Sequence, residues 1–149
     1  MPGMRRRSLF VSFPVLPQVK GLILARYDAV FNEAGRVLSA QDLVRAARGH
    51  DTMVVTATDR LERATIESLP HTVRVIATYS VGHEHIDLAA ASNRKLIVIN
   101  TPDVLTDAVA EVALFLMIGA ARRGTESIAL LRSRDWPGWS PVQLPGREL

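Results

Sequence analysis

The chain has no cysteine among its 149 residues, which excludes disulfide bonds and thiolate chemistry. This composition fits a reducing compartment, and we expect a cytoplasmic protein. Aromatic residues amount to only 5%, and the arginines are scattered apart from the run at residues 5–7. A nucleic-acid surface needs a clustered basic face with aromatic side chains between the charges. We therefore expect no nucleic-acid partner, in spite of the net charge of +3.

Long uncharged apolar runs are also missing. The longest candidate, residues 108–121, is too short to span a bilayer and contains Glu111, so we expect no membrane insertion. The three arginines followed by "SLFVSFPVL" resemble an export signal, even a twin-arginine one, but no small-residue cleavage site follows them. The favoured interpretation is a basic tail, residues 1–7, before a first buried strand.

The remaining composition, 48% hydrophobic and 22% charged, is typical of a globular protein with one core. Strand patterns are expected at residues 8–13, 25–31, 52–57, 73–79 and 96–100, and helix patterns at 39–49, 60–69 and 84–94. Ser39 is the expected N-cap of the first helix and Gly49 its stop. Alternating strands and helices predict an α/β fold with a parallel sheet and helices on both faces.

Ligands of such sheets bind where the carboxyl ends of strands meet the following loops. This rule selects "SVG" at residues 80–82 and "NTPD" at residues 100–103. Gly82 is expected to adopt a backbone conformation closed to other residues, and a helix starting near His83 or Glu84 is expected to direct free N–H groups at the same place. A carboxylate would fit there. The equally weighted alternative is that Gly82 only makes a tight turn.

A metal site is the competing interpretation of "TYSVGHEH". His83 and His85 are two residues apart and would point to different sides of a helix, and no His-Glu-x-x-His spacing occurs. His50 and His71 have no partners nearby in the sequence. We expect ordinary solvated histidines and no metal.

The sequence pattern changes at residue 103. "DVLTDAVAEVALFLMIGAARR" predicts a long helix with Thr106 as N-cap, apolar on nearly every side. Such a helix has to be covered all round, and we expect its own sheet and another chain or domain to cover it. A shorter helix pattern follows at residues 125–135, and the remainder, "WPGWSPVQLPGREL", has the composition of a linker.

Residues 73–123 resemble the D-isomer-specific 2-hydroxyacid dehydrogenase family. The stretches "SVG", "NTPDVLTD" and "DWPGWSP" are most similar to its glyoxylate/hydroxypyruvate reductase branch. The resemblance implies a flavodoxin-like substrate-binding domain whose N-terminal segment is residues 8–102. It further implies interdomain and dimerisation helices at 103–134 and a linker at 135–149 that leads to a nucleotide-binding domain.

The resemblance also implies roles for single residues. It assigns substrate binding to Ser80, Val81, Gly82 and Trp139, and contact with the nicotinamide cofactor to Leu105 and Thr106. Val81 and Gly82 match the loop whose backbone N–H groups hold the substrate carboxylate. Trp139 matches a residue that reaches the active site of the partner subunit.

Other parts of the family's machinery have no match in this chain. The Gly-x-Gly-x-x-Gly turn, the substrate arginine and the histidine–glutamate pair cannot be placed. The expected function is therefore the substrate-binding segment of a homodimeric reductase that uses NADP or NAD on a small 2-oxo acid such as glyoxylate or hydroxypyruvate. The isolated chain is expected to be inactive. The alternative is a non-catalytic dimerising α/β module that binds a small carboxylate.

Overall fold

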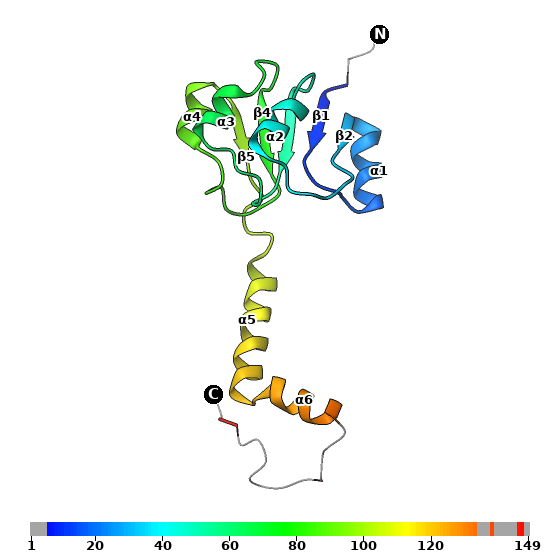
Figure 1. Ribbon diagram of the computed structural model, residues 1–149, viewed down its shortest axis with the longest axis vertical. Coiled ribbons are helices and arrows are strands. Elements are labelled where there is room, and N and C mark those ends of the chain that lie inside the picture. Colours follow the sequence, from blue (N-terminus) through cyan, green and yellow to red (C-terminus); the bar gives the residue numbers. More distant parts are fainter. Residues whose placement is uncertain (1–5, 134–137, 139–145, 148–149) are drawn as a thin grey trace. The chain divides into compact units, whose positions relative to one another are not determined.

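Five short strands form one parallel sheet in the computed structural model, which describes residues 6–133, 138 and 146–147. They are β1 (Ser8–Val11), β2 (Asp28–Phe31), β3 (Thr52–Val55), β4 (Val75–Thr78) and β5 (Ile97–Ile99). Their order is β2-β1-β3-β4-β5, and every neighbouring pair is parallel (Figure 1). This is the strand order of flavodoxin-like sheets. The predicted α/β class and parallel sheet are confirmed.

Four helices belong to the sheet: α1 (Pro17–Arg26), α2 (Ala40–Ala46), α3 (Arg63–Ser68) and α4 (Leu88–Asn93). The capping of α2 is as predicted, because the Ser39 side chain accepts a hydrogen bond from the Asp42 N–H. Gly49, at φ +83°, makes the turn that follows this helix. The left-handed backbone there is the reason why a glycine occupies the position.

The helix after β4 was predicted to start near His83 or Glu84, and this prediction is wrong. Helix α4 begins at Leu88, and the Asp87 side chain caps it by accepting from the Ala90 N–H. Before this helix, Ile86 forms an isolated parallel bridge with Leu61. The Leu61 N–H donates to His85 O, and the Asp87 N–H donates to Leu61 O. Residues 79–87 are therefore loop.

Helix α1 was not predicted. Its sequence has Gly21 in the middle, and its N-cap, Leu16, makes no side-chain cap hydrogen bond. Pro17 at the first turn was a usable signal, since proline is enriched there. The parallel pairing of β1 with β2 also requires a crossover connection, which this helix supplies.

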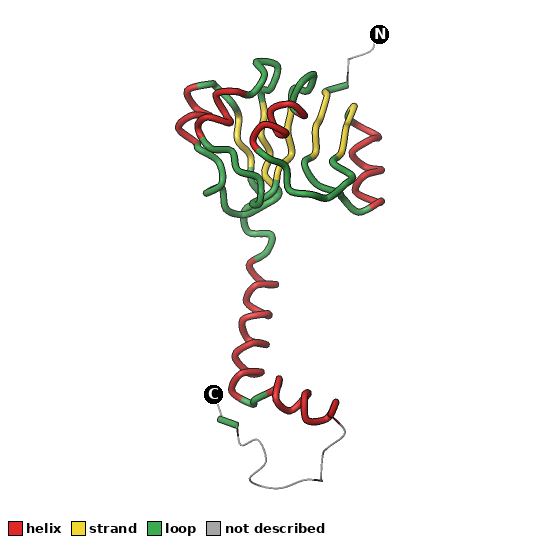
Figure 2. Tube along the Cα trace, viewed as in Figure 1, coloured by secondary structure: helices red, strands yellow, loops and turns green. Residues whose placement is uncertain are grey.

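The core lies between the sheet and helices α2, α3 and α4. Met53 and Ile76 from the strands and Leu43 and Ile66 from the helices are fully buried in it. Burial of each such side chain stabilises the fold by about 1.5–3 kcal/mol. Val54 points to the opposite face by strand alternation, toward α1, so helices lie on both faces as predicted (Figure 2).

That second face is covered unevenly. Helix α1 contacts β2, whereas Ile97 and Ile99 on the edge strand β5 are 59% and 51% exposed. Within residues 6–103, only α1 lies on this face, and it contacts β2 at the opposite edge of the sheet.

The chain divides into two compact units, residues 1–103 and 104–149. The second contains α5 (Thr106–Ala121) and α6 (Gly124–Ser133), and α5 has no buried residue. Thr106 was predicted as the N-cap, but it is the first residue of the helix, because Leu105 already adopts a right-handed helical conformation. No helix in the described part of the chain is long and apolar enough to cross a membrane.

Candidate functional site: two loops at the carboxyl edge of the sheet

The loops that follow β4 and β5 lie side by side, because these two strands are parallel neighbours. The Thr101 N–H donates to Ser80 O at 3.0 Å, and the Asn100 side-chain amide donates to Val81 O at 2.8 Å. The two loops selected from the sequence are thus brought together, and the second one supports the backbone of the first.

In the Ser80–Val81–Gly82 loop, the backbone carbonyl groups and the backbone N–H groups differ in their hydrogen bonding. Its three carbonyl groups all accept hydrogen bonds, the third from the Ser80 hydroxyl to Gly82 O at 2.7 Å. The N–H groups of Val81 and Gly82, in contrast, have no acceptor among the described residues. Val81 is 41% exposed. Two adjacent unpaired backbone donors at an accessible loop are available to an anion.

A buried chain of side-chain hydrogen bonds fixes this loop from below. His85 Nε2 lies 2.8 Å from Thr78 Oγ1, which lies 2.6 Å from Ser80 Oγ. The Ser80 hydroxyl hydrogen is already used on Gly82 O, so Thr78 must donate to Ser80. It follows that His85 Nε2 carries a proton and donates to Thr78.

His85 is buried, at 6% exposure, although it was expected to be solvated. Burial lowers the pKa of His85, and the nearby carboxylates of Glu84 and Asp59 only partly oppose this. The neutral Nε2–H tautomer fits the hydrogen-bond order. The part of the chain described here contains no group of three or more His, Asp or Glu side chains that could hold a metal ion.

The expected role of Gly82 needs a correction. Its backbone is not in the left-handed region that favours glycine. A Cβ atom at this position would lie 2.3 Å from Glu84 Oε2, the movable end of a side chain. The glycine therefore makes room for the Glu84 carboxylate, which occupies the space where a side chain would begin.

Two further features of this edge were not found from the sequence. Asp59, 2% exposed, accepts hydrogen bonds from the Ser12 hydroxyl at 2.5 Å and the Thr56 N–H at 2.9 Å. The rings of Phe13 and Tyr79 stack with centroids 5.6 Å apart beside an apolar cavity of about 290 Å³. Polar residues at the ends of strands were the available signal, because buried polar groups there require partners.

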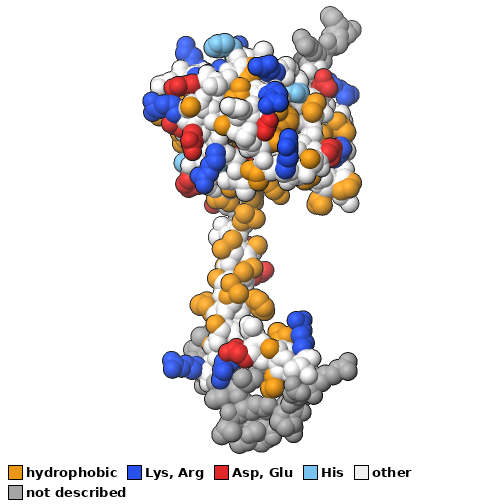
Figure 3. Space-filling view, viewed as in Figure 1, with side chains coloured by type: hydrophobic (Ala, Val, Ile, Leu, Met, Phe, Trp, Pro, Cys, Tyr) orange, Lys and Arg blue, Asp and Glu red, His pale blue; other side chains and the backbone are white. Residues whose placement is uncertain are grey.

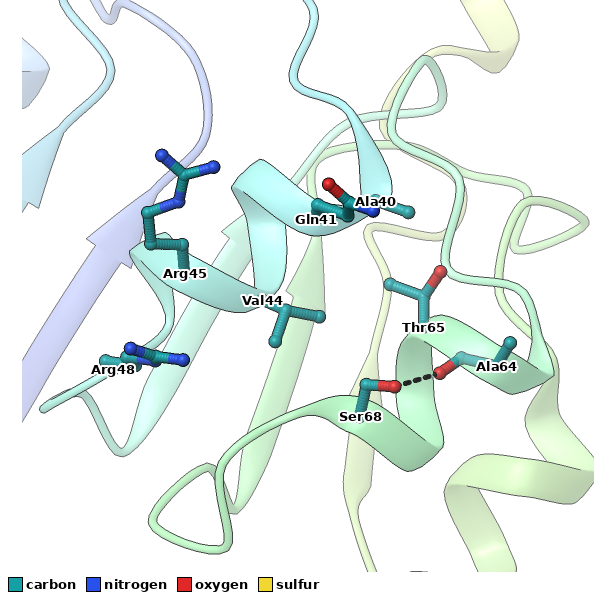
Figure 4. Close-up of a pocket in the computed structure, with 8 residues that line it drawn as sticks. All are labelled: Ala40, Gln41, Val44, Arg45, Arg48, Ala64, Thr65 and Ser68. Carbon is teal, nitrogen blue, oxygen red and sulfur yellow. Dashed lines mark hydrogen bonds between the residues drawn. The ribbon is translucent and has the colours of Figure 1, made fainter.

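Another cavity, about 470 Å³, lies between α2 and α3 (Figure 4). Two of its polar side chains are engaged: Ser68 donates to Ala64 O at 2.7 Å, and Arg45 pairs with Asp42 at 3.2 Å. The cavity lies on the helical side of the sheet and contains none of the residues predicted for binding. We do not assign it a ligand.

Of the predicted site residues, Ser80, Val81 and Gly82 belong to the first compact unit. Leu105 and Thr106 belong to the second, in which Leu105 is 49% exposed. Trp139 lies outside the described residues.

Comparisons with known proteins agree with this geometry. The sequence profile of the D-isomer specific 2-hydroxyacid dehydrogenase catalytic domain matches residues 10–136. The glycerate dehydrogenase of Hyphomicrobium methylovorum is 30% identical over 146 residues, which are 98% of this chain and 45% of that protein. The glyoxylate reductase of Thermofilum pendens is 38% identical over 112 residues, 74% of this chain and 33% of that protein.

A solved structure is also similar to this chain over nearly its whole length. A protein from Polaromonas sp. JS6 66, assigned as a D-isomer specific, NAD-binding 2-hydroxyacid dehydrogenase, superimposes with a TM-score of 0.90 at 38% identity. The match covers 97% of this chain and 45% of the other. The chain thus spans less than half the length of the relatives it matches.

Proposed function

Since the chain belongs to the D-isomer specific 2-hydroxyacid dehydrogenase family, we propose that it forms the substrate-binding part of a reductase that acts on small 2-oxo acids such as glyoxylate or hydroxypyruvate. The single observation that carries the proposal is the pair of unpaired N–H groups on Val81 and Gly82. The glyoxylate and glycerate enzymes among the relatives support this substrate class.

In this proposal the substrate carboxylate accepts hydrogen bonds from both N–H groups. The buried His85–Thr78–Ser80 chain and the Asn100 side chain engage the loop carbonyls, so that the loop backbone offers the anion its N–H donors. Two charge-assisted hydrogen bonds contribute about 3–6 kcal/mol before the costs of association and ordering. Millimolar affinity corresponds to about 4 kcal/mol, so the loop by itself binds weakly and selects for a carboxylate.

The family implies a nicotinamide cofactor, and NADP or NAD, when bound, supplies the hydride for the substrate carbonyl. We place Leu105 and Thr106 toward the nicotinamide, on the strength of the "DVLTD" match. The loop's part is to hold the carboxylate so that the neighbouring carbonyl carbon has a fixed position.

We also propose that the protein is a homodimer that associates through α5. The side chains of Val112, Phe115 and Leu116 are 56%, 72% and 60% exposed, and Figure 3 shows hydrophobic side chains along this helix. Exposed apolar surface on this scale favours association with another chain. The proposed role of Trp139, contact with the partner's substrate, belongs to the same dimer.

A non-catalytic module that binds a carboxylate uses the same loop and the same helix. The extent of the family match, residues 10–136, and the dehydrogenase relatives favour the reductase.

A chimera tests the proposal. This chain would replace the matched segment of the Hyphomicrobium methylovorum glycerate dehydrogenase, and oxidation of NADH and NADPH would be followed with glyoxylate and with hydroxypyruvate. We expect turnover with at least one pair. In the chimera, Gly82→Pro removes one N–H donor and should lower kcat/KM roughly 10- to 100-fold, whereas Gly82→Ala keeps the donor and should have a much smaller effect. A folded chimera that binds cofactor but reduces neither acid would contradict the proposal.

A further inference from the structure

The opposite end of the sheet carries a basic cleft. Lys, Arg and His side chains are present along the upper edge of the first unit in Figure 3, as elsewhere on this face, and the strands begin at this edge in Figure 1. A cleft of about 600 Å³ lies at this amino edge. Its charged and imidazole-bearing lining residues are Arg6, Arg7, His50, Asp51, His71 and Arg74.

The positive charge of this amino-edge cleft is not neutralised within the described chain. Arg6, Arg7 and Arg74 form no ion pair with any carboxylate among the described residues. The one acidic residue, Asp51, directs its carboxylate to the Ser8 N–H at 3.3 Å and the Thr52 hydroxyl at 2.7 Å. Arg6 Nη1 donates to the Leu24 carbonyl at 3.2 Å. Three arginines without an ion pair among the described residues therefore line the cleft, against one carboxylate that is already engaged.

The floor of the cleft is ordered rather than a set of loose surface side chains. His50 Nδ1 lies 2.7 Å from Ser8 Oγ, and the His50 ring lies 6.1 Å from the ring of the core residue Phe10. Its Nε2 atom has no partner among the described residues. The left-handed turn at Gly49 brings this imidazole to the start of β1. A fixed imidazole nitrogen beside three arginines that form no ion pair, of which Arg7 and Arg74 have no side-chain partner among the described residues, forms a polar surface for an anion.

The spacing of the arginines limits the size of the anion. Arg6 and Arg7 precede β1, Arg74 precedes β4, and β3 lies between these strands. Two strand spacings amount to roughly 10 Å. Arginine side chains from both sides can contact one ligand only if it has anionic groups at more than one point. Guanidinium groups bind phosphate oxygens in a bidentate manner.

The lining contains no Phe, Tyr or Trp, so it offers none of the aromatic platforms on which successive nucleic-acid bases stack. We propose that the amino-edge cleft binds a small anion with at least two phosphate groups, at the end of the sheet opposite the carboxylate-binding loop. The proposal does not depend on the reductase function.

Titration of the complete chain with inorganic pyrophosphate, orthophosphate and ADP, followed by calorimetry and by backbone amide shifts, tests this site. We expect pyrophosphate to bind at least tenfold more tightly than orthophosphate, with shifts at residues 49–51 and 71–74 and none at 81–82. ADP that binds as tightly as pyrophosphate identifies the diphosphate group as the recognised part. ADP that binds tenfold more weakly restricts the site to free diphosphates.

Variants separate the cleft from general surface charge. Arg74→Ala should weaken pyrophosphate binding at least tenfold, and Arg74→Lys, which keeps the charge but not the planar fork, should lie in between. Arg45→Ala removes the same charge from α2, outside the cleft, and should change the affinity less than twofold. Equal losses for Arg74→Ala and Arg45→Ala, or equal affinity for pyrophosphate and orthophosphate, would overturn the proposal.

Discussion

The two compact units of this chain differ in whether their apolar side chains are buried or exposed. In the first unit Leu43, Ile66 and Ile76 are completely buried between the sheet and helices α2 to α4. In the second, α5 is at least as apolar in sequence, yet Phe115 is 72% exposed and no residue of the helix is buried. The hydrophobic content of a helix therefore does not reveal where its partner surface lies. The first unit carries its own core, and the exposed apolar side chains of α5 are the basis for the proposed association with another chain.

Truncation of one large side chain in each unit should give the largest contrast. Leu43→Ala leaves a cavity in the core and should lower the free energy of unfolding by about 2–5 kcal/mol. Phe115→Ala should change it by about 0.5 kcal/mol or less, as is usual for an exposed position. Urea unfolding followed by far-UV circular dichroism at low protein concentration measures both. A loss for Phe115→Ala as large as that for Leu43→Ala would show that α5 is buried within its own chain.

A charge on α5 should sharpen the comparison by acting on association alone. Phe115→Glu places a carboxylate on the proposed dimer surface and should raise the dissociation constant at least tenfold, about 1.4 kcal/mol. Leu22→Glu is the matched control, since Leu22 is 63% exposed on α1. Sedimentation velocity over a range of concentrations distinguishes the two variants. A larger effect of Leu22→Glu would move the dimer surface to α1.

Stability should depend on pH through the first unit. Burial lowers the pKa of His85 below its ordinary value of 6.5. As the pH falls below 6.5, the unfolded chain takes up a proton that the folded chain does not, so stability is lost by at most about 1.4 kcal/mol per pH unit. Above that pH this group causes no change.

Thermal unfolding between pH 5 and 8 measures this loss. His85→Gln should flatten the acid side of the profile, because glutamine donates to Thr78 without titrating, and the exposed His71→Gln should leave the profile as it was. An unchanged profile in His85→Gln would remove His85 as the cause.

The smallest effect is expected at Glu84, whose carboxylate lies beside Gly82. Glu84→Gln removes a like charge next to the proposed anion and should tighten carboxylate binding two- to fivefold, less than about 1 kcal/mol at an exposed site. Glu67→Gln, on the exposed surface of α3, should have no effect. Titration with glyoxylate compares them, and weaker binding by Glu84→Gln would mean that the carboxylate helps to hold the loop.

Sequence patterns predicted most of the sheet, because short apolar runs bounded by turn residues have few other uses. Ser39 was found as a cap because its hydroxyl acts on a local backbone donor. The errors lie where tertiary contacts decide. Leu61 holds residues 85–87 extended and delays α4 to Leu88, and no local pattern reports such a contact.

The candidate site, like the fold, could be predicted only in part. The loop at residues 80–82 could be located from the topological rule and from the family resemblance. The reason why this loop exposes N–H donors could not be predicted. It depends on hydrogen bonds of Asn100, Thr78 and His85, which join positions up to 19 residues apart. The predicted left-handed backbone at Gly82 was wrong, since the absence of a side chain there makes room for the Glu84 carboxylate instead.

The most direct test of the central claim is the response of two backbone amides. In a ¹⁵N–¹H correlation spectrum of the complete chain, titration with glyoxylate should shift the Val81 and Gly82 amides together and saturably, with a dissociation constant on the order of 1 mM. The chloride salt at equal ionic strength should not shift them. Saturable shifts at other residues with these two amides unmoved, or no saturable shift up to roughly 100 mM, a hundred times that constant, would contradict the assignment of this loop as the carboxylate site.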